Sequence, residues 1–252
     1  MQKIYKIIIK PIFDLCIALV LLLVLFLPTL YFGIRIFLQD FSSPFYVPER
    51  VGKNNRKYKM IKFRSMVLNA DSNKVDSTSN DDPRITKLGA LIRRYKIDEI
   101  PNLINIIALK MSFVGPRPNV EREVNLYSSE EIKILRMRPG ITDISSIVFA
   151  DEGDILENSN DPDLDYNQLI RPWKSRLAIF YTKHASFSLD IKLMLLTLFN
   201  FINRKKTLII ISQILKKLNA SDDLIEIVLR NKKLVPTPPP GLSDIVQNRK
   251  VN

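Results

Sequence analysis

The chain has 252 residues, a formal net charge of +12, one cysteine (Cys16) and one histidine (His184). A single cysteine excludes a disulfide framework within the chain, and the lack of a Cys/His cluster argues against a zinc site. The positive charge predicts an anionic partner such as a lipid headgroup, a nucleic acid or a phosphorylated small molecule. The length allows one large domain or two small ones with a buried core.

The first forty residues have a basic start followed by a long apolar segment. No charged residue occurs from Leu15 to Ile34, about 30 Å of helix and enough to cross the hydrocarbon core of a bilayer. Pro28 interrupts this segment, and a proline removes one backbone hydrogen bond and kinks a helix. Cationic residues flank the segment on both sides, and such flanks belong on the cytoplasmic side of a membrane.

Three arrangements of this segment are open. A cleaved signal peptide is the least favoured, because no small-residue cleavage site follows Leu27. A straight helix could span the membrane, whereas a helix bent at Pro28 would return to the side on which it began. The basic flanks favour the bend, so residues 1–40 are predicted to form a re-entrant membrane anchor.

The segment from Tyr58 to Met66 alternates in part between basic and apolar residues, after a proline-containing connector over 42–55. It could be a half-buried strand or a short helix with a solvated basic face. Alternatively, Lys62 and Arg64 could bind phosphate or a lipid headgroup, since both residue types bind phosphate and Arg can do so through two hydrogen bonds.

Two helices are predicted after a polar surface loop over 69–82. Apolar residues at helical spacing predict the first helix near Lys87 to Lys96, with arginines at its end where they suit the helix dipole. The second is predicted to begin at the adjacent acidic residues Asp98 and Glu99. Pro101 is tolerated only in a first turn, and acidic residues are favoured there.

Asp98 and Glu99 allow two interpretations. They could cap the helix and pair with Arg93 or Arg94, which would contribute about 1 kcal/mol. Alternatively, one carboxylate could attack phosphorus to give an acyl phosphate, or bind Mg²⁺, which prefers a few oxygen ligands together with substrate phosphates.

Arg117 lies in the turn Gly-Pro-Arg-Pro, which follows this region. Both prolines restrict the backbone, so the arginine side chain is aimed by a stiff frame. Such a frame suits an arginine that binds phosphate or a base. A purely structural turn is the alternative.

The rest of the chain gives weaker signals. The acidic segment 151–157 predicts a solvated surface, with a second Mg²⁺ or sugar site as a lesser alternative. Aromatic and basic residues alternate over 171–206, which fits either helices lying at the membrane interface or ordinary core helices. Residues 206–252 are expected to add two short helices, divided at Ser221 and Asp222, and a Pro-rich tail that serves as a spacer or a docking strip.

A series of motifs, in order from about Lys10 to Leu198, carries a resemblance to a known family. The motifs are Lys10 with Asp14, Pro48 to Gly52, Lys62 to Met66, Asp82 to Gly89, Arg93 to Pro101, Asn105, Met111 to Pro118 and Arg138 to Thr142. In these residues the sequence resembles the bacterial sugar transferase family, the monotopic phosphoglycosyl transferases.

The resemblance implies a re-entrant helix broken at a proline and transfer of a sugar-1-phosphate from a UDP-sugar to polyprenyl (undecaprenyl) phosphate. By this resemblance Asp98 matches the nucleophile and Mg²⁺-associated acid, and Glu99 its partner. Arg93 matches a phosphate-binding arginine. Three further basic positions are expected to hold the substrate's charges: Lys62, Arg64 and Arg117.

The chain departs from the family pattern in two places. The pattern has Gly-Asp where this chain has Leu109-Lys110, and Gly followed by a Gln where this chain has Asp143 to Ser146. The second segment lies where contacts to the nucleotide or sugar are expected, so the identity of the donor sugar is left open.

The expected protein is mainly α with minor β (α/β), with a re-entrant anchor, a catalytic domain over 41–205 with interfacial helices, and the extension over 206–252. It would act on the cytoplasmic face of a bacterial inner membrane, in the first membrane step of surface glycan or glycoprotein oligosaccharide synthesis. The alternative is a non-enzymatic basic adaptor that binds anionic lipid or nucleic acid. No groove or stacking motif for nucleic acid is present in the sequence.

Overall fold

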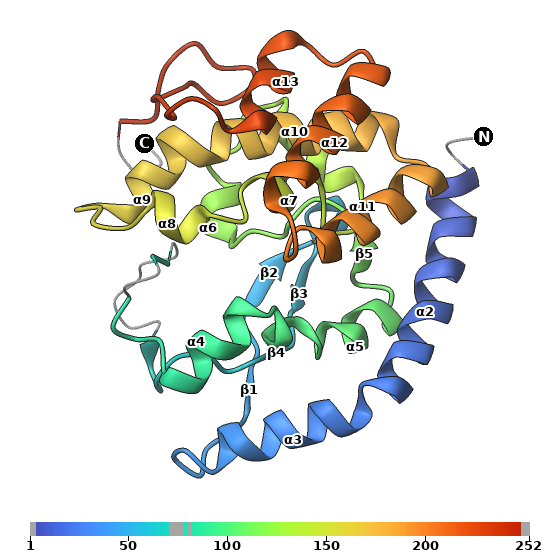
Figure 1. The fold of residues 1–252 in the computed structure, drawn as a ribbon, viewed down its shortest axis with the longest axis vertical. Helices are drawn as coiled ribbons and strands as arrows, with labels where there is room; N and C mark the ends of the chain where they lie inside the picture. The colour runs from blue at the N-terminus through green and yellow to red at the C-terminus, as the bar shows by residue number, and fades with distance from the viewer. Residues whose placement is uncertain (1–3, 71–77, 80–81, 248–252) are drawn as a thin grey trace.

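The computed structural model describes residues 4–70, 78–79 and 82–247. In this part of the chain the fold is mainly helical with a few short strands, as predicted (Figure 1). The helices, with η marking 3₁₀ and π turns, are η1 (Tyr5–Ile9), α2 (Lys10–Val24), α3 (Phe26–Phe37), η2 (Lys53–Asn55), α4 (Lys87–Arg94), η4 (Ile97–Glu99), α5 (Asn102–Ile107), α6 (Glu121–Val124), η5 (Glu131–Arg136), α7 (Ile144–Val148), α8 (Glu152–Ile155), α9 (Pro162–Asp165), η6 (Tyr166–Ile170), α10 (Arg171–His184), α11 (Phe187–Phe199), α12 (Arg204–Lys217) and α13 (Asp222–Leu229).

Within the described residues the strands form three separate two-stranded pairs. They are β1 (Phe45–Tyr46), β2 (Glu49–Val51), β3 (Lys57–Lys59), β4 (Lys62–Phe63), β5 (Ser112–Val114) and β6 (Gly140–Thr142). β1 with β4 and β2 with β3 are antiparallel, whereas β5 and β6 are parallel. The segment from Tyr58 to Met66 thus contains strand structure, one of the two forms that its alternating pattern allowed.

The apolar N-terminal segment consists of two helices that meet at a bend. The helix Tyr5–Val24 is the one helix in the described part of the chain that is long and apolar enough to cross a membrane. The chain leaves the helix at Leu25, three residues before Pro28, and α3 runs off in a different direction (Figure 1). A proline ring clashes with the carbonyl four residues earlier, here that of Val24, so the helix ends there and Pro28 falls in the first turn of α3.

Polar side chains attach α2 to the rest of the fold. Lys10 forms a buried ion pair with Asp190 of α11. Asp14 accepts a hydrogen bond from the Ser112 hydroxyl at 2.7 Å. Both charged residues of α2 are therefore inside the protein, and α2 is held against β5 and α11 while most of its remaining surface is exposed and apolar.

One hydrophobic core extends from α2 to the C-terminal helices. It contains Ala18 of α2, Met111 beside β5, Tyr181 of α10, Ile211 of α12 and Val228 of α13. The two predicted C-terminal helices are confirmed, with α13 beginning at Asp222 after Ser221. The extension over 206–247 packs on the same core as the residues before it.

The Pro-rich tail lies on the domain. The Thr237 N–H donates to the Gln168 carbonyl at 3.0 Å, and the Arg176 guanidinium donates to the Pro238 carbonyl at 2.9 Å. The Ser128 hydroxyl donates to the Pro240 carbonyl. The tail was expected to be a spacer or a docking strip, and in the structure it is packed against its own chain.

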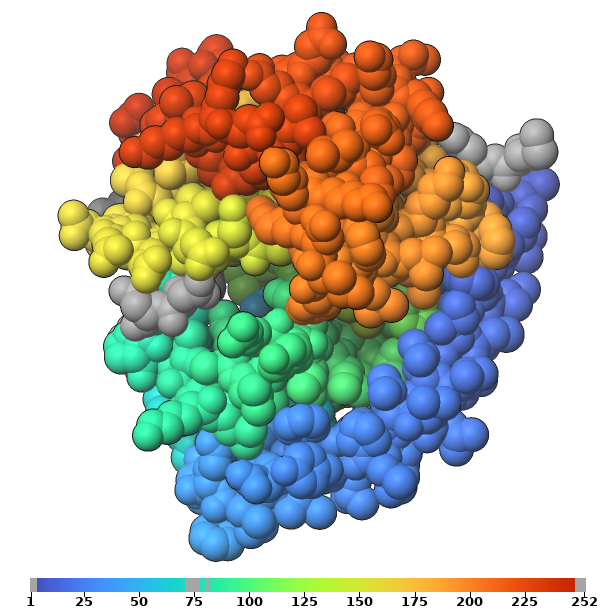
Figure 2. Space-filling model, viewed as in Figure 1, coloured from blue at the N-terminus to red at the C-terminus, as the bar shows by residue number. Residues whose placement is uncertain are grey.

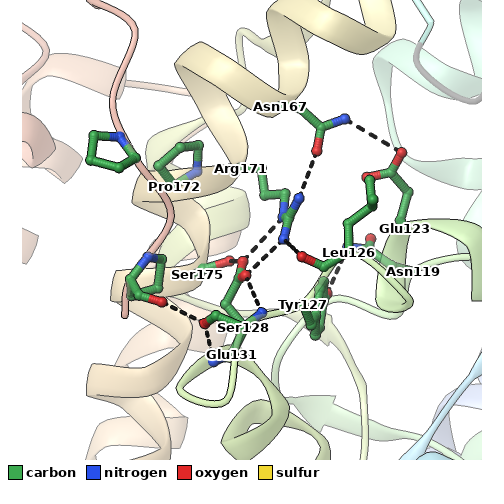
Figure 3. A network of polar contacts seen from close by, with 12 residues as sticks. Asn119, Glu123, Leu126, Tyr127, Ser128, Glu131, Asn167, Arg171, Pro172 and Ser175 are labelled. Atoms are coloured by element: carbon green, nitrogen blue, oxygen red, sulfur yellow. Dashed lines mark hydrogen bonds and ion pairs between the residues drawn. The ribbon is translucent and has the colours of Figure 1, made fainter. Parts of the chain in front are cut away.

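A buried polar network lies beside this tail (Figure 3). The Arg171 guanidinium is paired with the Glu131 carboxylate at 2.7 Å and also donates to the Asn167 amide oxygen at 2.9 Å and the Leu126 carbonyl at 2.6 Å. Ser175 donates to the same carboxylate at 2.6 Å. Arg171 is 1 % exposed and Glu131 is fully buried, so each charge depends on the other.

The predicted start of the second helix needs correction. The first predicted helix is present as α4, but Asp98 and Glu99 lie in the short turn η4 ahead of the second helix, with Pro101 between that turn and α5. α10 is a core helix along most of its length. Much of the predicted polar loop over 69–82 lies outside the described residues.

We expect Ile211→Ala to lower the free energy of unfolding by about 2–5 kcal/mol, because it leaves a cavity in the core against which α12 packs. Ile209→Ala on the same helix is the matched control. Ile209 is 41 % exposed, and its loss should change stability by only about 0.5 kcal/mol. Chemical denaturation in detergent measures both; equal effects would show that the extension does not share the core.

We expect Arg171→Met to lower the free energy of unfolding by about 3–5 kcal/mol, since it leaves the Glu131 carboxylate buried without its cation. The double variant Arg171→Met/Glu131→Gln removes both charges and should recover a large part of that loss. A double variant no more stable than Arg171→Met in the same denaturation assay would contradict this account of the network.

Candidate active site

The two carboxylates predicted as the site lie in η4, directly after α4. Lys96 has a left-handed backbone (φ 57°), which ends the helical run and starts the new turn. Ile97 packs against the small cluster of Ile36, Phe63 and Ile92, so the turn is fixed to α3, β4 and α4. The turn thereby directs Asp98 and Glu99 toward Lys62 of β4.

Glu99 is held by two cations from different parts of the chain. Its carboxylate receives two hydrogen bonds from the Arg117 guanidinium, at 2.5 Å and 3.2 Å, and one from the Lys62 ammonium at 3.1 Å. Arg117 also donates to the Ile141 carbonyl at 3.2 Å. The structure thus brings together the η4 turn, β4, the Gly-Pro-Arg-Pro turn and β6.

Asp98 has a different environment. Its side chain is buried, and Oδ2 lies 3.8 Å from the Lys62 ammonium. The other oxygen, Oδ1, is buried and has no hydrogen-bond partner within the described part of the chain. A buried carboxylate oxygen without a partner is energetically costly, and such an atom calls for an unplaced ligand or a chemical role.

The two neighbouring carboxyl groups have opposite pKa shifts. Burial raises the pKa of Asp98 above its ordinary value, an effect that the nearby Lys62 charge only partly offsets. Burial would also raise the pKa of Glu99, but the charges of Arg117 and Lys62 outweigh it and hold that pKa well below its usual range. Glu99 is therefore the permanent anion of the pair, and Asp98 is the group whose protonation can change.

Close backbone packing aims Arg117 at Glu99. The residue before the first proline, Gly115, lies against Gly140 of β6, and a Cβ on Gly140 would come within 2.1 Å of the Gly115 nitrogen. Only glycine allows this approach. The turn is thereby seated on β6, where Arg117 reaches both Glu99 and the Ile141 carbonyl.

A cavity of about 1180 Å³ lies beside this cluster: Lys62, Glu99 and Arg117 line it, whereas Asp98 lies behind Lys62 and is not part of the lining. It opens as a hollow between the segment that carries α4 and α5 and the segment that ends α11 (Figure 2). Cationic side chains form one part of its lining: Arg50, Lys62, Arg93, Arg94, Lys96, Arg117, Arg171 and Lys174. Another part is apolar and includes Leu25 at the bend, Leu198 of α11 and Phe201.

The predicted basic residues are not all in this cavity. Lys62, Arg93 and Arg117 line it, and the side chain of Arg93 forms no hydrogen bond or ion pair within the described residues. Arg64 lies elsewhere: its guanidinium pairs with Asp40 at 2.6 Å and donates to the Ser43 carbonyl at 3.0 Å. That geometry attaches β4 to the end of the N-terminal segment, so the position of Arg64 lends no support to a role in binding substrate.

Sequence reasoning left other lining residues unassigned. Thr142, Ser145 and Ser146 line the cavity, and the last two lie in the segment that departs from the family pattern. That departure was the one feature of the sequence that could have drawn attention to Ser145 and Ser146. Leu109 and Lys110, the other departure, do not line it. Glu152 and Asp154 of the acidic segment 151–157 also line the cavity. Their position is compatible with the lesser alternative for that segment, a second Mg²⁺ or sugar site.

The fit of a metal ion can be judged from the donor atoms. The described residues contain no group of three or more His, Cys, Asp or Glu side chains that could hold a metal. Mg²⁺, however, is often bound through one or two carboxylates together with substrate phosphates. Asp98, with one oxygen that has no partner among the described residues and the cation-lined cavity reached past Lys62 and Glu99, fits that mode.

Comparison with known proteins identifies relatives of this chain. It is 40 % identical over 154 residues to the exopolysaccharide production protein ExoY of Sinorhizobium fredii, covering 55 % of this chain and 68 % of the relative. It is 37 % identical over 148 residues to the UDP-galactose-lipid carrier transferase of Erwinia amylovora, covering 53 % of this chain and 31 % of the relative.

A third relative matches more of this chain. The undecaprenyl-phosphate glucose phosphotransferase of Komagataeibacter xylinus is 32 % identical over 196 residues, covering 75 % of this chain and 35 % of the relative. The chain thus spans about a third of the Erwinia and Komagataeibacter proteins. The family model for bacterial sugar transferases matches residues 5–204, and the chain therefore belongs to the bacterial sugar transferase family.

Proposed function

We propose that this protein transfers a sugar-1-phosphate from a UDP-sugar to undecaprenyl phosphate through a covalent phospho-aspartyl intermediate on Asp98. The observation that carries this proposal is the Asp98 carboxylate, which is buried and has one oxygen without a partner among the described residues. It lies directly behind two residues that line the cation-rich cavity, Glu99 and Lys62, with its other oxygen 3.8 Å from the Lys62 ammonium. The names of two relatives, a UDP-galactose-lipid carrier transferase and an undecaprenyl-phosphate glucose phosphotransferase, support the same substrate classes.

The first step is attack of an Asp98 carboxylate oxygen on the β-phosphorus of the donor. A phosphorus–oxygen bond to Asp98 forms, the bond to the bridging oxygen breaks, and UMP leaves. In the second step a phosphate oxygen of undecaprenyl phosphate attacks the same phosphorus and displaces the carboxylate. The product is an undecaprenyl-diphosphate sugar, and Asp98 is free for another cycle.

Glu99 and the cations around it have separate roles in this scheme. Glu99 stays ionised and positions Arg117 and Lys62, which would face the negative charge of the donor diphosphate. The Arg93 side chain lines the cavity and forms no hydrogen bond or ion pair within the described residues, so it is available to bind the same phosphates.

Mg²⁺ would be held by Asp98 together with the donor phosphates, in keeping with the unpartnered Asp98 oxygen. The chemistry that Mg²⁺ supplies when bound is neutralisation of the diphosphate charge, which makes UMP a better leaving group.

The two kinds of lining in the cavity suit two different substrates. The cationic part suits a water-soluble nucleotide-sugar, and the apolar part at Leu25, Leu198 and Phe201 suits the first isoprene units of a lipid acceptor. Leu198 and the neighbouring Ile202 are 67 % and 81 % exposed, so apolar surface continues outward from this part.

The membrane placement is part of the proposal. We infer that α2 and α3 enter the cytoplasmic leaflet of the inner membrane and return to the same side, with the bend at Leu25 as the deepest point. In support, the two helices diverge at the bend, and Lys10 and Asp14 are buried against the catalytic domain. A straight spanning helix would place the residues after 40 on the opposite side of the membrane from Lys10 and Asp14. These two side chains would then be separated from their partners, Asp190 and Ser112.

Substitution of Asp98 by Asn should abolish UMP release, because an amide does not form the acyl phosphate. The assay incubates the purified full-length protein with a panel of UDP-sugars, Mg²⁺ and undecaprenyl phosphate. Glu157→Gln removes an exposed carboxylate and should leave the rate unchanged. Release by Asp98→Asn at the wild-type rate, or no release from any donor by the wild type, would refute the mechanism.

The pH dependence of UMP release should show that Asp98 must be ionised. Because burial raises its pKa, kcat/KM should fall as the pH is lowered through a value above that of an ordinary aspartate. Lys62 opposes that shift, so Lys62→Met should move the acidic limb to higher pH, apart from any loss of donor binding.

Lys59→Met, which removes an exposed lysine of β3, is the control for the pH experiment and should leave the limb in place. An unchanged limb in Lys62→Met would mean that Asp98 is not the titrating group.

A further inference from the structure

A second cavity, separate from the one beside Asp98, lies against the N-terminal helix. Its volume is about 400 Å³, and it shares no lining residue with the larger cavity. Lys6, Ile7, Lys10 and Asp14 line it from η1 and α2. The rest of the lining comes from η2, β5, the last residue of η5 and the link from η5 to β6: Lys53, Ser112, Arg136, Met137 and Arg138.

The charges in this cavity are unbalanced. Lys10 is neutralised by Asp190, and the Lys6 ammonium donates to the Thr182 carbonyl at 2.7 Å. The side chains of Lys53, Arg136 and Arg138 form no hydrogen bond or ion pair within the described part of the chain. Among the described residues, Asp14 is the one carboxylate in the lining, and it is buried beside Lys10 and accepts a hydrogen bond from Ser112. Three cations without partners outnumber this single carboxylate and repel one another, and a bound anion would relieve that repulsion.

The surroundings indicate what kind of anion would bind. Ile7 lines the cavity, and it and its neighbours Ile4 and Ile8 are each more than half exposed. The cationic lining thus adjoins the exposed apolar surface of the N-terminal helix. Such a boundary between basic and apolar surface suits an amphipathic ligand with a phosphate at the bilayer surface and acyl chains beside the helix.

We propose that this cavity binds the phosphate group of an anionic phospholipid. Three side chains would contact the phosphate oxygens: Arg136 at the end of η5, Arg138 two residues later in the link to β6, and Lys53 on η2. The acyl chains would lie along the isoleucines of η1. This site would fix the N-terminal end of the apolar helix at the level of the headgroups, independently of the chemistry at Asp98.

The test is a binding titration of the full-length protein in an uncharged detergent, followed by native mass spectrometry. The probes are short-chain phosphatidylglycerol, short-chain phosphatidylcholine and inorganic phosphate. We expect the wild type to bind phosphatidylglycerol, and the triple variant Lys53→Gln/Arg136→Gln/Arg138→Gln to bind it at least about tenfold more weakly. Lys53 and Arg136 are exposed, so their substitution should not disturb the fold.

A matched variant controls for the loss of overall charge. Lys216→Gln/Lys217→Gln/Lys233→Gln removes three exposed lysines from the C-terminal extension and should bind phosphatidylglycerol like the wild type. Equal weakening in both variants would overturn the site. Binding of phosphatidylcholine as tight as that of phosphatidylglycerol would overturn anion recognition. Inorganic phosphate binding as tightly as the lipid would overturn the lipid assignment.

The titration contains no sugar donor and no polyprenyl acceptor, so its result does not depend on the proposed transferase reaction. Asp98→Asn should bind phosphatidylglycerol like the wild type. A tenfold loss of lipid binding in that variant would show that the two cavities are not independent, and would overturn the inference.

Discussion

The shared hold of Arg117 and Lys62 on Glu99 is the interaction on which the site depends. It joins four segments that are far apart in the chain: β4, η4, the Gly-Pro-Arg-Pro turn and β6. The two carboxyl groups beside these cations have pKa values shifted in opposite directions. Glu99 accepts hydrogen bonds from both cations, whereas Asp98 is buried and one of its oxygens has no partner among the described residues. A carboxyl group whose protonation can change therefore lies beside one that stays ionised.

The second constraint is the attachment of the apolar helix to the catalytic domain. Buried contacts of Lys10 and Asp14 hold α2 against α11 and β5, and the break forced by Pro28 then places Leu25 in the lining of the larger cavity. An apolar segment and a cation-lined site thus meet in one cavity. A reaction between a soluble donor and a lipid acceptor requires that both substrates reach one site, and a cavity with cationic and apolar lining allows this.

Much of the local structure could be predicted from the sequence, whereas the partners of individual side chains could not. The spacing of apolar residues predicted α4, and two helices were also expected where α12 and α13 lie. The motifs around Asp98 pointed to Lys62 and Arg117. The pairing of Arg64 with Asp40 could not be foreseen, because both ends of that contact depend on how β4 meets the N-terminal segment. The left-handed Lys96, which sets η4 apart from α4, has no sequence signature of its own.

The covalent intermediate is the central claim, and the mass of the intact protein tests it most directly. The wild-type protein is mixed with its UDP-sugar and Mg²⁺ without undecaprenyl phosphate. The account predicts UMP release limited to about one turnover and a mass increase of one sugar-phosphate, located on Asp98 and absent in Asp98→Asn. UMP release that requires the lipid acceptor, with no adduct on the protein, would indicate direct transfer between the substrates and contradict the account.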